Sequence, residues 1–100
     1  MTFEQFNSGK GLTLTLDARL SAVTAEELEK ELQTRLKGIE DFVVDMSRLT
    51  YVSSAGLRVL LKAQKAMNIQ GKMTIKNAAD PTIMNVFQTT GFNEILQIEK

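Results

Sequence analysis

The stretch that decides the fold is residues 41–71, DFVVDMSRLTYVSSAGLRVLLKAQKAMNIQG. It opens with a short apolar run, residues 42–46, which predicts a central parallel strand covered on both faces. After a small polar turn, apolar residues at helical spacing predict a helix that begins near Ser54. A strand, a short connection and a helix place the helix start at the carboxyl edge of a sheet, where open α/β folds hold ligands. We therefore expect any function to lie at this junction.

Two serines, Ser53 and Ser54, stand at the expected start of this helix. The first N–H groups of a helix have no partner within the helix, and the helix dipole makes them attractive to negative charge. A hydroxyl there can cap the helix, which contributes about 1 kcal/mol. It can also carry a phosphate that the same N–H groups favour. Helix chemistry alone favours the cap and leaves the phosphate open.

The strands are predicted from alternating and short apolar runs. Residues 2–6 and the alternating leucines and threonines of residues 12–16 predict two strands, most simply a hairpin. Residues 73–76 alternate as a further strand, and residues 94–98 can return as a last one. With helices in the intervals, this order predicts one α/β domain, residues 1–100, with a mixed, mostly parallel sheet of about five strands and three main helices. The strand order stays open.

The first helix has a complete start signal. Thr24 is expected as its N-cap, and Glu27, three residues on, completes a capping box. Val23 and Leu28 are spaced as a hydrophobic staple.

Glycine and proline indicate where the helices of the second half of the chain begin and end. Gly56 in the first turn of the second helix is costly relative to alanine, which indicates a close approach by a partner or by a neighbouring strand. Gly71 closes that helix. Asp80 and Pro81 open a third helix as N-cap and first residue, and Gly91 stops it.

The composition excludes most familiar catalytic and metal sites. The chain has 100 residues with no cysteine and no histidine. Disulfides, thiol nucleophiles, Ser/His/Asp arrangements and zinc sites with nitrogen or thiolate ligands are therefore unavailable. Carboxylates could hold magnesium, but no two are placed as an evident pair. Asp45, near the end of its strand, could be functional, could cap the following turn or could pair with Arg48. We expect no catalysis, no metal and no cofactor.

Charge is balanced overall but divided along the chain. Twelve basic and twelve acidic residues give a net charge of zero, yet residues 46–79 hold six basic residues and no acidic one, whereas acids lead seven to three in residues 21–45. The asymmetry indicates either a face for a protein partner or complementary surfaces on neighbouring helices. Without aromatic stacking residues or excess positive charge, no nucleic-acid partner is expected. No apolar run approaches the roughly 20 residues of a membrane span, and the start is unlike a secretory signal, so a cytoplasmic location is expected.

Several segments together resemble a known family. Asp45-Met46-Ser47, the segment VSSAGL of residues 52–57 and the following VLL of residues 59–61 resemble the signature of the STAS domain, the fold of bacterial anti-sigma factor antagonists. The segments LTLTLDARLSAVTA, residues 12–25, and TGF, residues 90–92, resemble two further parts of that family. The resemblance extends over nearly the whole chain.

The resemblance implies a function and a site. In that family the phosphorylated serine lies two residues before the glycine, which is Ser54 here. It implies an anti-sigma factor antagonist that docks on an anti-sigma factor serine kinase, is released by phosphorylation at Ser54 and is restored by a serine phosphatase. The residues expected to form the partner-binding surface are Ser21, Ser53, Ala55, Gly56, Arg58 and Lys62.

The chain also departs from the family pattern. Ser53 stands where the family usually has an aspartate just before the phosphorylated serine, and Ser21 replaces a second family aspartate. This leaves an alternative: a non-phosphorylated STAS adaptor in a signalling or transport-associated complex, in which Ser53 and Ser54 only cap the helix. A nucleotide-binding enzyme is disfavoured, because the Ser-Ser-Ala-Gly turn is too short for a P-loop and lacks its lysine.

Overall fold

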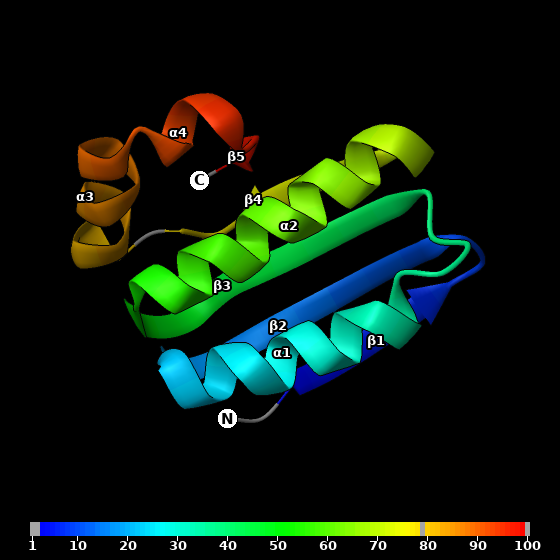
Figure 1. The fold of residues 1–100 in the computed structure, drawn as a ribbon, viewed down its shortest axis with the longest axis horizontal. Coiled ribbons are helices and arrows are strands. Elements are labelled where there is room, and N and C mark those ends of the chain that lie inside the picture. Colours follow the sequence, from blue (N-terminus) through cyan, green and yellow to red (C-terminus); the bar gives the residue numbers. More distant parts are fainter. Residues whose placement is uncertain (1–2, 79, 100) are drawn as a thin grey trace.

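One five-stranded sheet organises the chain (Figure 1). The computed structural model describes residues 3–78 and 80–99, so Thr2 of the first predicted strand lies outside the described residues. The elements are, in order, β1 (Phe3–Ser8), β2 (Gly11–Leu20), α1 (Ala22–Arg35), β3 (Asp41–Val52), α2 (Ser54–Gln70), β4 (Lys72–Lys76), α3 (Pro81–Thr90), the short α4 (Phe92–Ile95) and β5 (Ile98–Glu99). The strands follow one another across the sheet in chain order. Only β1 and β2 pair antiparallel, which confirms the predicted mixed, mostly parallel sheet and α/β fold.

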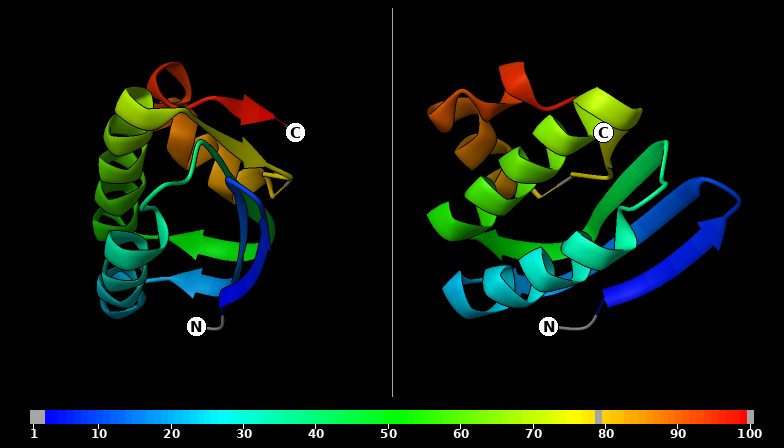
Figure 2. Two further views of the ribbon diagram at one scale, coloured as in Figure 1. Left: turned by 90° about the vertical axis from the view of Figure 1, so that its right-hand side faces the viewer. Right: turned by 45° about the vertical axis from the view of Figure 1, so that its right-hand side comes forward.

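The helices lie on one side of the sheet. Helices α1 and α2 run side by side over β2 and β3 (Figure 1), and the left view of Figure 2 shows both on the same side of the strands. In β3, Phe42, Val44 and Met46 point into this core and are at most 1% exposed, whereas Val43 and Asp45 between them are half-buried. The prediction that this strand is covered on both faces is therefore wrong. The alternation shows a strand with one face toward the helices and one partly open.

Two strands run further than predicted. Strand β2 ends at Leu20, and β3 ends at Val52, because the two stay paired in parallel through two shifts of register up to the Leu20–Val52 pair. Asp45 consequently lies inside β3, and not near its carboxyl end. At the other end of the chain, the short helix α4 occupies the start of the last predicted strand, so β5 begins only at Ile98.

The start of α1 also differs from the prediction. Ser21 is the N-cap: its Oγ accepts a bond from the Thr24 N–H at 3.4 Å, while Thr24 Oγ1 accepts one from the Ser21 N–H at 2.7 Å. Thr24, and not Glu27, therefore completes the capping box. Val23 is 69% exposed, which rules out the predicted staple. The cause is the length of β2, which leaves Ser21 as the only residue between strand and helix.

Candidate functional site

The carboxyl ends of β2 and β3 form two equivalent junctions. Leu20 and Val52 are cross-strand partners and the last residues of their strands. Ser21 follows the first and caps α1, and Ser53 follows the second and caps α2. The Ser53 N–H donates to the Leu20 carbonyl at 2.8 Å, which ties the junctions together. The starts of α1 and α2 therefore lie next to each other at one edge of the sheet, at the left of Figure 1.

The two adjacent serines have different environments. Ser53 is half-buried and has an extended backbone, and its Oγ accepts a bond from the Gly56 N–H at 3.1 Å. It is therefore the capping residue. Ser54 is the first residue of α2 and is exposed. Because Ser53 provides the cap, the helix start does not need the hydroxyl of the exposed Ser54.

Gly56 has a packing role. It is buried, and a Cβ added to it would lie 2.7 Å from Leu20 Cγ and 2.8 Å from Leu20 Cδ2. Leu20 itself is fully buried. The close approach indicated by the sequence is therefore that of the neighbouring strand β2. Gly56 is therefore packed against β2, and its predicted place among the partner-binding residues stays a prediction.

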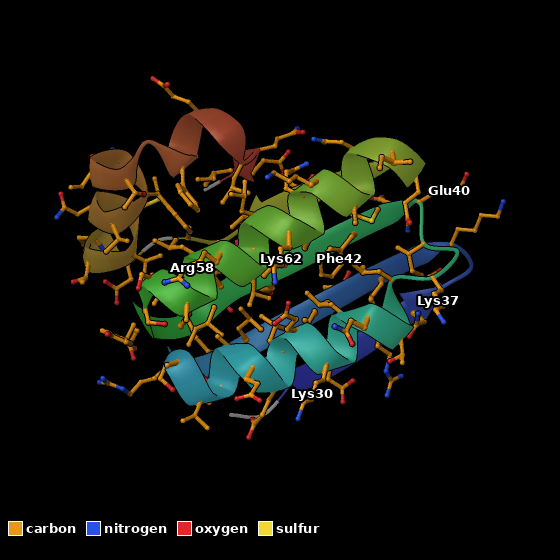
Figure 3. All side chains as sticks on the ribbon, in the orientation of Figure 1. Lys30, Lys37, Glu40, Phe42, Arg58 and Lys62 are labelled. Atoms are coloured by element: carbon orange, nitrogen blue, oxygen red, sulfur yellow. The ribbon has the colours of Figure 1, made fainter. Side chains whose placement is uncertain are left out.

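The two predicted cations lie along α2 and are both exposed (Figure 3). Lys62 Nζ bonds Glu29 Oε1 of α1 at 2.6 Å, so this lysine ties the two helices together. Among the described residues, no carboxylate pairs with Arg58, which lies nearer the helix start. The Glu29–Lys62 pair favours the interpretation of the charge asymmetry as complementary surfaces on neighbouring helices.

A small hollow lies between the starts of α1 and α2. Its volume is about 180 Å³, and small side chains from both helices line it, namely Ala22, Ala25 and Ala55. Arg58 and Lys62 also contribute to its wall. The structure thus brings together the predicted Ala55, Arg58 and Lys62 at one place. Ser21 and Ser53 cap the two helices at the same edge.

One pair at this edge escaped the sequence analysis. The guanidinium carbon of Arg19 lies 4.3 Å from the centre of the Tyr51 ring, a cation–π contact between the ends of β2 and β3. Tyr51 is 38% exposed. Only the strand register makes Arg19 and Tyr51 neighbours. Because that register contains two shifts, the sequence carried no signal for the pair.

Asp45 is held within the fold by hydrogen bonds. Its Oδ1 accepts from the Ser47 N–H at 2.9 Å and from Asn77 Nδ2 at 3.2 Å, linking β3 to the segment after β4. Burial raises the pKa of Asp45, but hydrogen bonds from Ser47 and Asn77 and the charge of Arg48 outweigh it and bring the pKa below the ordinary 3.8. Of the three roles left open for Asp45, the hydrogen bonds support local capping, and the charge of Arg48 also acts on this carboxylate.

The described residues contain no group of three or more His, Cys, Asp or Glu side chains that could hold a metal ion. No helix in the described part of the chain is both long and apolar enough to cross a bilayer.

Comparison with known proteins gives consistent matches. Residues 5–97 match the family model described as "Mlab, STAS domain". The chain is 37% identical over 89 residues to BtrV of Bordetella bronchiseptica, which is provisionally named an anti-sigma factor antagonist; the match covers 87% of this chain and 76% of BtrV.

Solved structures share the fold at low sequence identity. A protein of Thermotoga maritima, also provisionally named an anti-sigma factor antagonist, matches with a TM-score of 0.89 and 17% identity, covering 98% of this chain and 86% of that one. The anti-sigma factor antagonist SpoIIAA in its unphosphorylated form matches with a TM-score of 0.84 and 17% identity, covering 99% and 89%. Bacillus SpoIIAA in its phosphorylated form matches with a TM-score of 0.75 and 17% identity, covering 99% and 92%.

Proposed function

Because this chain belongs to the STAS domain family, we propose that it is an anti-sigma factor antagonist that works as a phosphorylation switch. In its unmodified form it docks on an anti-sigma factor that is also a serine kinase. Phosphorylation of Ser54 by that kinase releases it, and a serine phosphatase restores it. The chain itself supplies a docking surface and an acceptor hydroxyl, and performs no catalysis.

The observation that supports this proposal is that Ser53 caps α2, whereas Ser54 is the exposed first residue of the helix. Ser53 caps α2 through the Gly56 N–H, so Ser54 Oγ is not needed for the cap. A phosphate brings about −1.5 to −2 charge at neutral pH. At the first position of α2, the free N–H groups and the helix dipole favour that charge. The modification therefore requires no change of fold. SpoIIAA, whose fold is shared, exists in both unphosphorylated and phosphorylated forms.

Release follows from the cost of covering a newly added charge at an interface. A partner that covers the neutral Ser54 hydroxyl would, after phosphorylation, face a dianion for which it has no counter-charge. Burying such a charge costs several kcal/mol. Each 1.4 kcal/mol lost lowers the affinity about tenfold. A small local modification is thus sufficient to separate the two proteins.

The two departures from the family pattern are compatible with the switch. The family aspartates correspond to Ser21 and Ser53, and in this structure both positions are helix N-caps. Serine and aspartate are both strong N-cap residues. The replacements therefore preserve the two helix starts and remove only negative charge beside Ser54.

The test is incubation with ATP and the serine kinase-type anti-sigma factor proposed as the partner, followed by intact-mass measurement. The unmodified chain and a Ser8→Ala variant, which removes an exposed serine at the end of β1, should each gain one phosphate. A Ser54→Ala variant should gain none. The assignment fails if the unmodified chain stays unmodified or if Ser54→Ala still accepts the phosphate.

A Ser54→Asp variant separates the switch from the adaptor alternative. An aspartate at this position places a charge where the phosphate would stand. The switch predicts a loss of affinity for the kinase-type partner of about tenfold or more. Unaltered affinity would favour an adaptor in which both serines serve only the helix start.

A further inference from the structure

Arg58 lies one helical turn after Ser54 on α2. Residues four apart on a helix are surface neighbours, with Cβ atoms about 5–6 Å apart. Both residues are exposed, so their side chains can meet without displacing any core residue. Arginine presents a planar fork of N–H donors that matches phosphate oxygens two at a time. Geometry therefore places a phosphate-binding side chain beside the proposed phosphorylation site.

Arg58 also forms no ion pair with the described residues of the unmodified protein. The next cation along this side of α2, Lys62, is engaged by Glu29 at 2.6 Å. Glu26, the other carboxylate lining the hollow, has Lys30 at 4.0 Å on its own helix. No carboxylate in the described part of the chain pairs with Arg58. Within the described residues, its guanidinium therefore has no carboxylate to give up when a new anion appears.

The surroundings leave space for the contact. Arg58 borders the hollow of about 180 Å³, which is lined by the short side chains of Ala22, Ala25 and Ala55 and also by Glu26 and Glu29. Helix α2 contains no acidic residue in its first turn or anywhere in its length. A phosphate at Ser54 therefore meets Arg58 as its nearest charged neighbour on the same helix.

We propose that Arg58 is the residue that holds the phosphate of phosphorylated Ser54. The guanidinium donates N–H bonds to two phosphate oxygens and keeps the group against the start of α2. The phosphorylated protein then presents an ordered dianion in place of the neutral hydroxyl. The guanidinium of Arg58 is bound to that dianion. This inference rests on the proposed phosphorylation of Ser54, and it assigns Arg58 a positioning role in the modified form.

The test measures the second pKa of the phosphate by ³¹P NMR. Phosphoserine is introduced at position 54 during translation, so no kinase is needed. A neighbouring cation favours the dianion, and thus lowers this pKa. Arg58→Gln should raise it by about 0.15–0.4 units, the equivalent of one helical ion pair. Arg58→Lys should retain most of the effect, since it keeps the charge while losing the fork.

Lys65→Gln is the matched control. It removes the same charge from an exposed position of α2, eleven residues beyond Ser54, about 16 Å along the helix. It should change the phosphate pKa by less than about 0.1 units, because solvent and salt screen a charge at that distance. Equal shifts in Arg58→Gln and Lys65→Gln, or no shift in either, would overturn the proposal.

The outcome is separable from that of the proposed function. If the kinase-type partner leaves Ser54 unmodified, the switch fails whatever the NMR titration shows. If phosphorylation by the partner occurs and Arg58→Gln leaves the phosphate pKa unchanged, the switch stands and the role of Arg58 is refuted.

Discussion

Residues Ser53 and Ser54 show how position within one turn decides what a hydroxyl can do. Ser53 is the last extended residue before α2, so its Oγ points back to the Gly56 N–H at 3.1 Å. Ser54 is the first helical residue and is exposed. The sequence predicted a cap and a modifiable hydroxyl at this pair. The hydrogen bond of Ser53 assigns the cap.

Removal of the cap should weaken the fold without touching the proposed acceptor. Ser53→Ala leaves the Gly56 N–H without its side-chain partner and should lower the free energy of unfolding by about 1 kcal/mol. Urea denaturation measures this. Ser8→Ala, an exposed position at the end of β1, should stay within about 0.5 kcal/mol of the unmodified protein. Equal stability of the two variants would contradict the assignment of Ser53 as cap.

Gly56→Ala should reveal the contact with Leu20. The added Cβ would lie under 3 Å from two atoms of a fully buried leucine, at 2.7 and 2.8 Å. The gain in helix propensity, about 1 kcal/mol at most, is smaller than the usual 1–3 kcal/mol cost of overpacking. We expect a net loss of stability, and a smaller loss when Leu20→Ala is already present. A stabilising Gly56→Ala, or two additive substitutions, would show that the packing is looser than described.

Asp45 should contribute a pH-dependent part of the stability. Its folded-state pKa is lowered, so its contribution is present above its ordinary pKa and is lost as the pH falls through the lowered value. Between about pH 5 and pH 2, the unmodified protein should therefore lose more unfolding free energy than Asp45→Asn. The difference should stay under about 1 kcal/mol because the carboxylate is partly exposed. Parallel urea titrations of the two proteins across this range measure it, and identical pH profiles would contradict the assignment.

At the scale of elements, the order and type of the main helices and strands followed from the sequence, but several boundaries did not. Alternation in residues 12–16 and the apolar run of residues 42–46 correctly located β2 and β3. Their later halves pair through shifted register, and in β3 exposed residues break the alternation, so the local pattern did not predict these extensions. The early helix start at Ala22 is a consequence of the same extension. A strand boundary that depends on pairing with another strand cannot be predicted from the local alternation of apolar and polar residues.

The contact between α1 and α2 agrees with the distribution of charge along the sequence. Acids predominate in the first helix and bases in the second, and Glu29–Lys62 joins them at 2.6 Å. A double-mutant cycle with Glu29→Gln and Lys62→Gln should give a coupling of about 0.2–1 kcal/mol, weakened by added salt, because the pair is largely exposed. Equilibrium unfolding of the four proteins measures it. A coupling of zero at low salt would show that the bridge does not hold the helices together.

Across the whole molecule, the fold brings the starts of both long helices to one edge of the sheet. Sequence resemblance predicted Ser54, Arg58 and Lys62 as surface residues there, and all three are exposed. It could not predict the burial of Gly56, which depends on Leu20 of another strand. Nor could it find the Arg19–Tyr51 contact, which depends on register. The exposure of these three residues was thus predictable, and the tertiary neighbours of Gly56 and Arg19 were not.

The central claim is that a phosphate on Ser54 changes binding without changing the fold. Its most direct test compares the unmodified chain with the chain carrying phosphoserine at position 54, measuring the Kd for the kinase-type anti-sigma factor and the amide NMR spectrum in parallel. We predict a Kd higher by about 100-fold or more, with spectral changes confined to the start of α2 and its neighbours. An unchanged Kd, or a spectrum altered throughout the domain, would contradict the account.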